Sequence, residues 1–260
     1  MSSGLAPPAL FDRALIAARR ARAPAGGDFV TELVLAELAE RLASVNRRFA
    51  RAALVGPTLS GLDVDLPMVD ALELVPTLTP RHSDDMPALA TGVYDLLASM
   101  LDLQAVNDVP GTLMRLRRRL KPDGLFLAVA LGGASLGELR AAWIAADAGI
   151  AGGAYARVAP FMDVRDAGSL LQRAGFAMPV SDSDTHRVRY ADPLRLMREI
   201  KGLGAANPMA DKPRRPVTRR HLVAAMAAYP RDGDGRITAT LELIWMSGWA
   251  PDDGGRGSAI

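Results

Sequence analysis

The chain has 260 residues, 49% of them hydrophobic and 23% charged, which is the composition of a folded protein with a substantial core. The absence of cysteine excludes disulfides, thiolate metal sites, iron–sulfur clusters and a cysteine nucleophile. The formal net charge is only +2 and the two signs are interspersed along the sequence, so the charge pattern does not favour nucleic-acid binding.

Helix and strand patterns alternate from the start of the chain. Residues 11–22 are rich in arginine and predict a helix on the surface. A second helix is expected from Thr31, a residue suited to cap it, because apolar residues then recur at spacings of three and four. Two short apolar runs follow at residues 52–55 and 71–75, each closed by a proline-bearing turn, and both are typical of buried strands.

The next part of the chain predicts a strand, a helix and another strand. Residues 94–103 form a long apolar stretch, and residues 107–108 then begin a helix with leucines along its inner side. The Lys-Pro-Asp-Gly sequence at 121–124 predicts a sharp turn at the end of this helix. Residues 125–131 are uniformly apolar, as strands of a buried parallel sheet are.

Three further helices are predicted after this strand. Ser135 and Glu138 fit a capping box that opens a helix over residues 136–148. Residues 166–174 predict another helix, with Gly175 as its C-terminal cap. One more apolar helical face is expected in the 190s, before a basic loop that contains prolines.

The C-terminal part predicts a closing strand, because apolar and polar residues alternate from Ile237 to Leu243. The Asp-Gly-Asp-Gly sequence at 232–235 predicts a hairpin turn before it. We expect a single layered α/β domain over residues 1–250, with helices on both faces of the sheet and a closing strand able to run antiparallel. Residues 251–260 are expected to form a flexible tail.

Several motifs resemble those of a known family. The most particular are Gly132-Gly133 followed by Glu138-Leu139-Arg140, and the closing Met246-Ser247-Gly248-Trp249. The further segments of the same pattern, which extend over nearly the whole chain, are Phe11-Asp12-Arg13-Ala14-Leu15, Tyr94-Asp95-Leu96, Val106-Asn107-Asp108, Leu120-Lys121-Pro122-Asp123-Gly124, Pro160-Phe161 and Arg173-Ala174-Gly175-Phe176. With these motifs the chain resembles the methyltransferase-like assembly factors of respiratory complex I, which are similar to the malonyl-carrier methyltransferases of biotin synthesis.

The resemblance implies a Rossmann-like class I methyltransferase sheet of seven strands, with S-adenosylmethionine at the carboxyl ends of the strands. It also implies a protein partner, since members of this group are linked to assembly of complex I and to arginine hydroxylation of one of its subunits. We expect the N-terminal half of the sheet to be shortened here. Only residues 57–70 separate the first two strands, whereas a parallel crossover needs about a dozen residues and usually includes a helix.

The cofactor loop departs from the family pattern, which reads roughly D-x-G-x-G-x-G. Glycines are needed there because the backbone must approach the ligand closely. Gly56 aligns with a motif glycine and Gly61 ends the segment, but Thr58 and Ser60 stand where the next two glycines belong. Leu54 replaces the acid that organises the loop.

Other residues match positions that bind S-adenosylmethionine in the family. Glu73, in the second strand, is the candidate for the ribose hydroxyls, and Asp84 or Asp85 for the adenine. Leu101, after Met100 at the end of the central strand, is a candidate for the floor of the site. Each position has an ordinary alternative, because carboxylates at strand ends are commonly solvated and apolar residues commonly belong to the core.

The motifs for two other chemistries, metal binding and serine hydrolysis, are weaker. The residues at 232–235 suggest a calcium loop, but Leu243 stands where the bidentate glutamate belongs. The three histidines are far apart in sequence without metal-ligand spacing, and no metal site is predicted. Ser135 lies in a G-x-S-x-G sequence, so a hydrolase with Asp184 and His186 is the alternative to a capping role for this serine.

Two functions therefore stay open. One is a methyltransferase-fold protein with a degenerate cofactor loop that acts by binding a protein partner, and the alternative is an active S-adenosylmethionine-dependent methyltransferase with an atypical loop. A partner-binding protein can fill the cofactor crevice with Leu59, Leu62 and Met68, whereas an enzyme needs open backbone amides there. No apolar run approaches the roughly 18 residues of a membrane span and no secretory signal is visible, so a cytoplasmic protein is expected.

Overall fold

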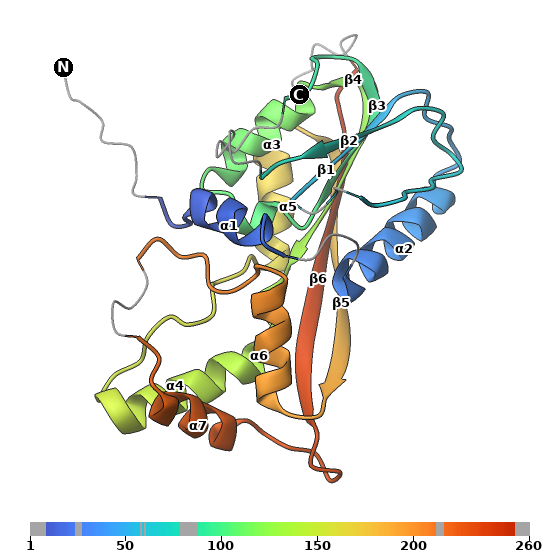
Figure 1. The fold of residues 1–260 in the computed structure, drawn as a ribbon. Coiled ribbons are helices and arrows are strands. Elements are labelled where there is room, and N and C mark those ends of the chain that lie inside the picture. The colour runs from blue at the N-terminus through green and yellow to red at the C-terminus, as the bar shows by residue number, and fades with distance from the viewer. Residues whose placement is uncertain are drawn as a thin grey trace, which may run out of the picture.

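The structure is a computed structural model and describes residues 9–23, 28–57, 59, 61–78, 88–211 and 216–252. In this part of the chain, six strands form one sheet in the order β2-β1-β3-β4-β6-β5 (Figure 1). The strands are β1 (Ala52–Gly56), β2 (Leu72–Pro76), β3 (Tyr94–Met100), β4 (Leu120–Leu131), β5 (Ala177–Tyr190) and β6 (Ile237–Trp249).

Strand direction confirms the predicted α/β class. The first four strands pair in parallel, and β6 is inserted antiparallel between β4 and β5. Because β1, β2 and β3 run the same way, Gly56, Pro76 and Met100 end at one edge of the sheet, here called the carboxyl edge. The seventh strand that the family resemblance implies has no counterpart among the described residues.

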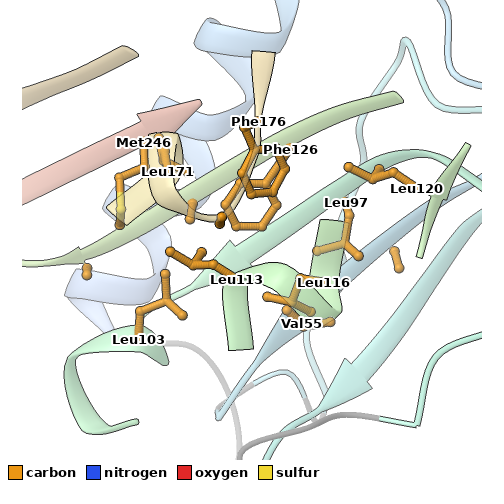
Figure 2. Close-up of a cluster of buried hydrophobic side chains, with 14 of the residues drawn as sticks. Val55, Leu97, Leu103, Leu113, Leu116, Leu120, Phe126, Leu171, Phe176 and Met246 are labelled. Atoms are coloured by element: carbon orange, nitrogen blue, oxygen red, sulfur yellow. The ribbon is translucent and has the colours of Figure 1, made fainter. Parts of the chain in front are cut away.

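Helices cover both faces of the sheet, as predicted (Figure 1). On one face lies α2 (Phe29–Ser44), whose buried Val34, Leu38 and Leu42 pack against the strands. On the other face lie α3 (Val109–Arg117) and α5 (Val164–Arg173), and Figure 2 shows the core that they close. In that core the rings of Phe126 and Phe176 stack with centroids 4.9 Å apart.

The connection from β1 to β2 contains no helix in its described residues, 57, 59 and 61–71. Instead, Leu59 and Leu66 are buried in the core cluster under α2, and Leu62 and Met68 pack against it. Apolar side chains of an irregular segment thus replace the expected crossover helix. The predicted shortening of the N-terminal half is therefore confirmed.

The β5–β6 pair extends beyond the rest of the sheet. Pairing of β4 with β6 ends at Leu131↔Leu243, whereas β5 and β6 continue to Tyr190↔Ile237. Three helices pack on this extension and have their own core with Trp143, Leu196 and Tyr229: α4 (Gly137–Ala151), α6 (Pro193–Gly202) and α7 (Arg219–Ala228). We call these three helices and the extension the helical lobe, which lies at the bottom of Figure 1.

Both predicted helix caps at Thr31 and Ser135 were wrong. Helix α2 begins earlier, and Asp28 caps it by accepting a hydrogen bond from the Thr31 N–H at 3.0 Å. The hydroxyl of Ser135 instead exchanges two 3.0 Å hydrogen bonds with the backbone of Glu242, which ties α4 to β6. Position 136 at the start of α4 adopts the left-handed conformation, with φ of 55° and no side-chain cap.

Two further predictions need correction, and two elements were missed. Residues 121–124 belong to β4 and not to a turn, because β4 begins at Leu120 and is irregular in register beside Tyr94. The turn at 232–235 connects α7 to β6, so it joins a helix and a strand instead of forming a hairpin. Strand β5 and helix α7 were not predicted at all.

Candidate functional site

The carboxyl edge is the first place to look for a ligand, because doubly wound sheets bind ligands where their parallel strands end. Gly56 closes β1 at this edge. A Cβ atom at position 56 would lie 2.8 Å from the backbone oxygen of Met100 and 3.5 Å from a methyl carbon of Leu59. Close packing between β1 and β3 is therefore sufficient to require glycine here.

Leu101 directly follows β3 at the carboxyl edge, as the sequence suggested, but in an unusual conformation. Its φ of 49° is in the left-handed region, which is strained for a leucine. The conformation is held because the Leu101 N–H donates to the Val129 oxygen at 2.9 Å and the Gln104 amide donates to the Leu101 oxygen at 2.7 Å. This bend ends β3 and turns the chain toward Asp102. Gly61 also has positive φ, 80°, with open space where a Cβ would be.

A buried ion pair follows directly at this edge. Arg13 from α1 (Arg13–Arg20) is 4% exposed, and its Nη2 lies 3.3 Å from Oδ1 of Asp102, which is equally buried. The Thr77 hydroxyl donates to the same oxygen at 2.8 Å, and Arg13 Nη1 donates to the Ala105 oxygen at 3.1 Å. Charge-assisted hydrogen bonds of this kind join α1 to the ends of β2 and β3.

Helix α1, predicted over residues 11–22, keeps Ala14 and Ala18 exposed and is held by hydrogen bonds on two sides. Phe11 exchanges hydrogen bonds of 2.8 and 3.0 Å with the side chain of Asn107. On the other side, Arg19 donates to the Ala206 oxygen at 2.9 Å, and the Asp12 N–H donates to the Pro208 oxygen at 2.9 Å. The helix therefore lies between the carboxyl edge and the loop after α6 (Figure 1).

Arg20, at the end of α1, is also largely enclosed. Burial lowers the pKa of its guanidinium, and the carboxylates of Asp28 and Asp102 act in the opposite direction. Arg13 and Arg20 thus bring two cationic groups toward one carboxylate at the carboxyl edge. The arrangement suits an internal electrostatic contact better than a polar cofactor, because the Asp102 oxygen is already engaged.

Glu73 does not lie at the carboxyl edge. It is the second residue of β2 and pairs in register with Ala53, three residues or roughly 10 Å before the strand ends. The Tyr94 hydroxyl donates to Glu73 Oε2 at 2.7 Å, and Arg51 lies 3.6 Å from the same oxygen. Burial, and then Glu73, raise the pKa of Tyr94.

The other acids proposed for the adenine, Asp84 and Asp85, lie outside the described residues, as do Thr58, Ser60 and His82. In the part of the edge that the structure describes, β2 ends in Pro76 and Thr77, neither of which is an acid able to hold a ribose. Leu59 lies against Gly56, and Asp102 is engaged by Arg13 and Thr77. These described residues do not fit S-adenosylmethionine in the position that the resemblance implies.

Two of the family motifs meet at the opposite, amino edge of the sheet. Asp95 accepts hydrogen bonds from Lys121 Nζ at 2.9 Å and from the Arg51 N–H at 3.0 Å. Burial opposes ionisation of this carboxyl, but Lys121 and the Arg51 N–H outweigh it and lower the pKa of Asp95. The Tyr94-Asp95 and Leu120–Gly124 motifs are thus explained by contact between β3 and β4.

The hydrolase residues do not come together. Both hydrogen bonds of the Ser135 hydroxyl go to the backbone of Glu242. His186 Nε2 lies 2.9 Å from Glu37 Oε1, and Asp184 pairs with Arg41 at 2.7 Å. Across the described ranges, no group of three or more His, Asp or Glu side chains is placed to hold a metal ion. No described helix has the length and hydropathy needed to cross a membrane.

Sequence comparison identifies the relatives of this chain. It is 33% identical over 246 residues to arginine-hydroxylase NDUFAF5, mitochondrial, from Danio rerio, and the alignment covers 87% of this chain and 76% of the relative. The chain belongs to the NDUFAF5 family. It is also 35% identical over 182 residues to the protein of the same name from Mus musculus, of which the match spans about half, 53%.

A second group of relatives carries another activity. The chain is 36% identical over 159 residues to a malonyl-[acyl-carrier protein] O-methyltransferase from Halorhodospira halophila, covering 60% of this chain and 52% of the relative. Among solved structures, a putative methyltransferase from Bacillus halodurans is similar with a TM-score of 0.49 and 13% identity, over 87% of this chain and 100% of the other. No family profile matches the chain.

Proposed function

We propose that this chain is a methyltransferase-fold protein with a degenerate cofactor loop, which acts by binding a protein partner during assembly or regulation of a larger complex. The family resemblance makes respiratory complex I the first candidate for that complex. The proposal is supported by two contacts at the carboxyl edge, where Leu59 packs against Gly56 and Arg13 pairs with Asp102.

The free-energy cost of opening the carboxyl edge favours partner binding over cofactor binding. A cofactor that displaced Leu59 and separated the Arg13–Asp102 pair would lose about 2 kcal/mol for the exposed leucine and roughly 3–5 kcal/mol for the broken ion pair. Together these terms would weaken binding by about four to five powers of ten, since each 1.4 kcal/mol is roughly tenfold. A micromolar site would thus bind only far above millimolar cofactor.

Calorimetric titration with S-adenosylmethionine and S-adenosylhomocysteine tests the proposal. We expect no heat of binding at millimolar ligand. Micromolar binding would overturn the proposal and support the active methyltransferase with an atypical loop. A Glu73→Ala variant serves as control, because Glu73 lies at the amino edge and its removal should change no cofactor affinity.

Arginine hydroxylation, the activity named for the zebrafish relative, is the second candidate because that match spans most of both chains. Deletion of the gene in its host separates the two candidates. Loss of an assembled complex without any change in arginine mass supports partner binding, whereas loss of one oxygen atom from an arginine in a subunit supports hydroxylation. Native gel electrophoresis measures the assembled complex, and mass spectrometry of the isolated subunits measures the arginine mass.

We also propose a cytoplasmic protein that folds as one unit over residues 1–250, followed by a tail over 251–260. The hydrogen bonds that β4 makes with Ala250 support this boundary, since Ala250 donates to Gly124 at 2.8 Å and accepts from Asp123 at 3.0 Å. Imaging of a fluorescent fusion in the host tests the location. A signal confined to another compartment would contradict it.

A further inference from the structure

The helical lobe has a surface groove between α4 and α7 that no part of the chain described here fills. From α4 it is lined by Ala145, Gly149 and Ile150, and from α7 by Val223, Ala227 and Arg220. Apart from Arg220, every lining side chain is apolar or absent. We call this surface the α4–α7 groove.

Val223, in the wall of the groove, is 57% exposed. Most other residues that line the groove are alanine or glycine, so the helix backbones lie close to the surface. Two helices pack at about 8–10 Å, and small contact residues favour the near end of that range. The groove thus has the shape and chemistry to accept the apolar face of a third helix.

Charge at the groove is one-sided. Arg219 and Arg220 occupy the first turn of α7, which contains no acidic residue, although positive charge at a helix N-terminus opposes the helix dipole. No ion pair involves either arginine in the described chain, and the sequence from 212 to 231 contains no Asp or Glu. An anionic group bound beside the groove would remove this unfavourable arrangement.

The acids of α4 do not supply that anionic group. Glu138 accepts hydrogen bonds from the backbone and side chain of Thr240, and Asp147 is fully buried against Arg157 at 2.6 Å. The groove is therefore apolar with a positive rim. Nucleic acid is the poorer match, because the groove offers no aromatic side chain for stacking.

We propose that the α4–α7 groove binds an amphipathic helix of a partner protein, with its apolar face on Val223 and Ile150 and acidic residues toward Arg219 and Arg220. The inference deepens the partner-binding function proposed above and gives the chemistry of the partner segment. It does not depend on the carboxyl edge, so cofactor binding there would overturn the proposed function without affecting the groove.

Two labelled synthetic helices test the inference by fluorescence anisotropy with the full chain. Both peptides carry leucines at spacings of three and four, and one has glutamates beside them where the other has lysines. We expect the acidic peptide to bind and both Val223→Asp and Arg220→Glu to weaken it by roughly tenfold or more. Arg220→Glu should at the same time strengthen binding of the lysine peptide.

Met114→Asp is the matched control, since Met114 on α3 is 41% exposed and lies outside the groove. It should leave the affinity unchanged. Four outcomes would overturn the inference: equal binding of both peptides, equal loss in the control, preferential binding of a single-stranded RNA oligonucleotide, or no peptide binding at millimolar protein. Self-association abolished by Val223→Asp, seen in sedimentation, would also overturn it by assigning the groove to a second copy.

Discussion

The carboxyl edge and the helical lobe each place an arginine among apolar side chains. At the edge the arginine is buried in an ion pair, whereas in the lobe it is exposed. Arg13 at the edge is 4% exposed and lies against Asp102, with Leu59 buried nearby. Arg220 in the lobe is exposed beside Val223 and belongs to none of the ion pairs of the described chain. In the described part of the edge the arginine is thus paired within the chain, whereas the lobe leaves apolar and charged groups exposed.

Different local packing accompanies the difference. The described residues between β1 and β2 form no helix, and Leu59 and Leu66 pack under α2 instead. In the lobe, α4 has 15 residues and α7 only 10, so α7 covers α4 incompletely.

The largest expected effect comes from the ion pair at the carboxyl edge. Asp102→Ala removes the buried carboxylate that faces Arg13, and we expect a loss of about 3–5 kcal/mol in the free energy of unfolding, because a buried charge loses its partner. Urea denaturation followed by circular dichroism measures it. A loss below about 1 kcal/mol would show that water reaches Arg13 and that the edge is open.

Leu59→Ala should have a smaller effect, roughly 2–4 kcal/mol, because it removes apolar burial and leaves a cavity beside Gly56. The same titration in urea measures the change. If the proposed filling of the edge is right, this variant should bind S-adenosylmethionine more tightly than the parent chain does. A parent-like stability would contradict a closed edge.

High pH should weaken the lobe through Tyr190. Burial, and then its hydrogen bond to Glu199, raise the pKa of Tyr190 from 10.0 to about 12. The Tyr190 hydroxyl therefore stays protonated to a higher pH in the folded state than in the unfolded state. Its contribution to stability is complete below pH 10 and is lost as the pH rises toward 12. Melting temperatures between pH 9 and 12 should fall less steeply in Tyr190→Phe, and parallel curves would contradict the assignment.

The smallest effect is expected at the groove. Val223→Asp places a charge on a side chain that is already 57% exposed, so the free energy of unfolding should change by no more than about 0.5 kcal/mol. Thermal unfolding measures this directly. A large destabilisation would mean that Val223 belongs to the lobe core and would remove it from any binding surface.

Local patterns predicted many of the elements. The apolar periodicity of α2 and the apolar runs of β1 and β2 are properties of neighbouring residues, and the structure confirms all three elements. Strand β5 was missed because its side chains are mostly polar and exposed, as at the edge of a sheet, and its pairing with β6 supplies its order. Local capping rules also failed at Ser135, because the partner of its hydroxyl is the distant Glu242.

The sequence by itself determined the fold class, the shortened N-terminal half and the family resemblance, because motifs and connection lengths are encoded over a few neighbouring residues. Only the tertiary structure placed Glu73 at the amino edge and joined Arg13 to Asp102 across 89 positions of sequence. No local pattern encodes such a contact, since it depends on how α1 packs against the ends of β2 and β3. The apolar groove between α4 and α7 arises for the same reason, from two helices far apart in the chain.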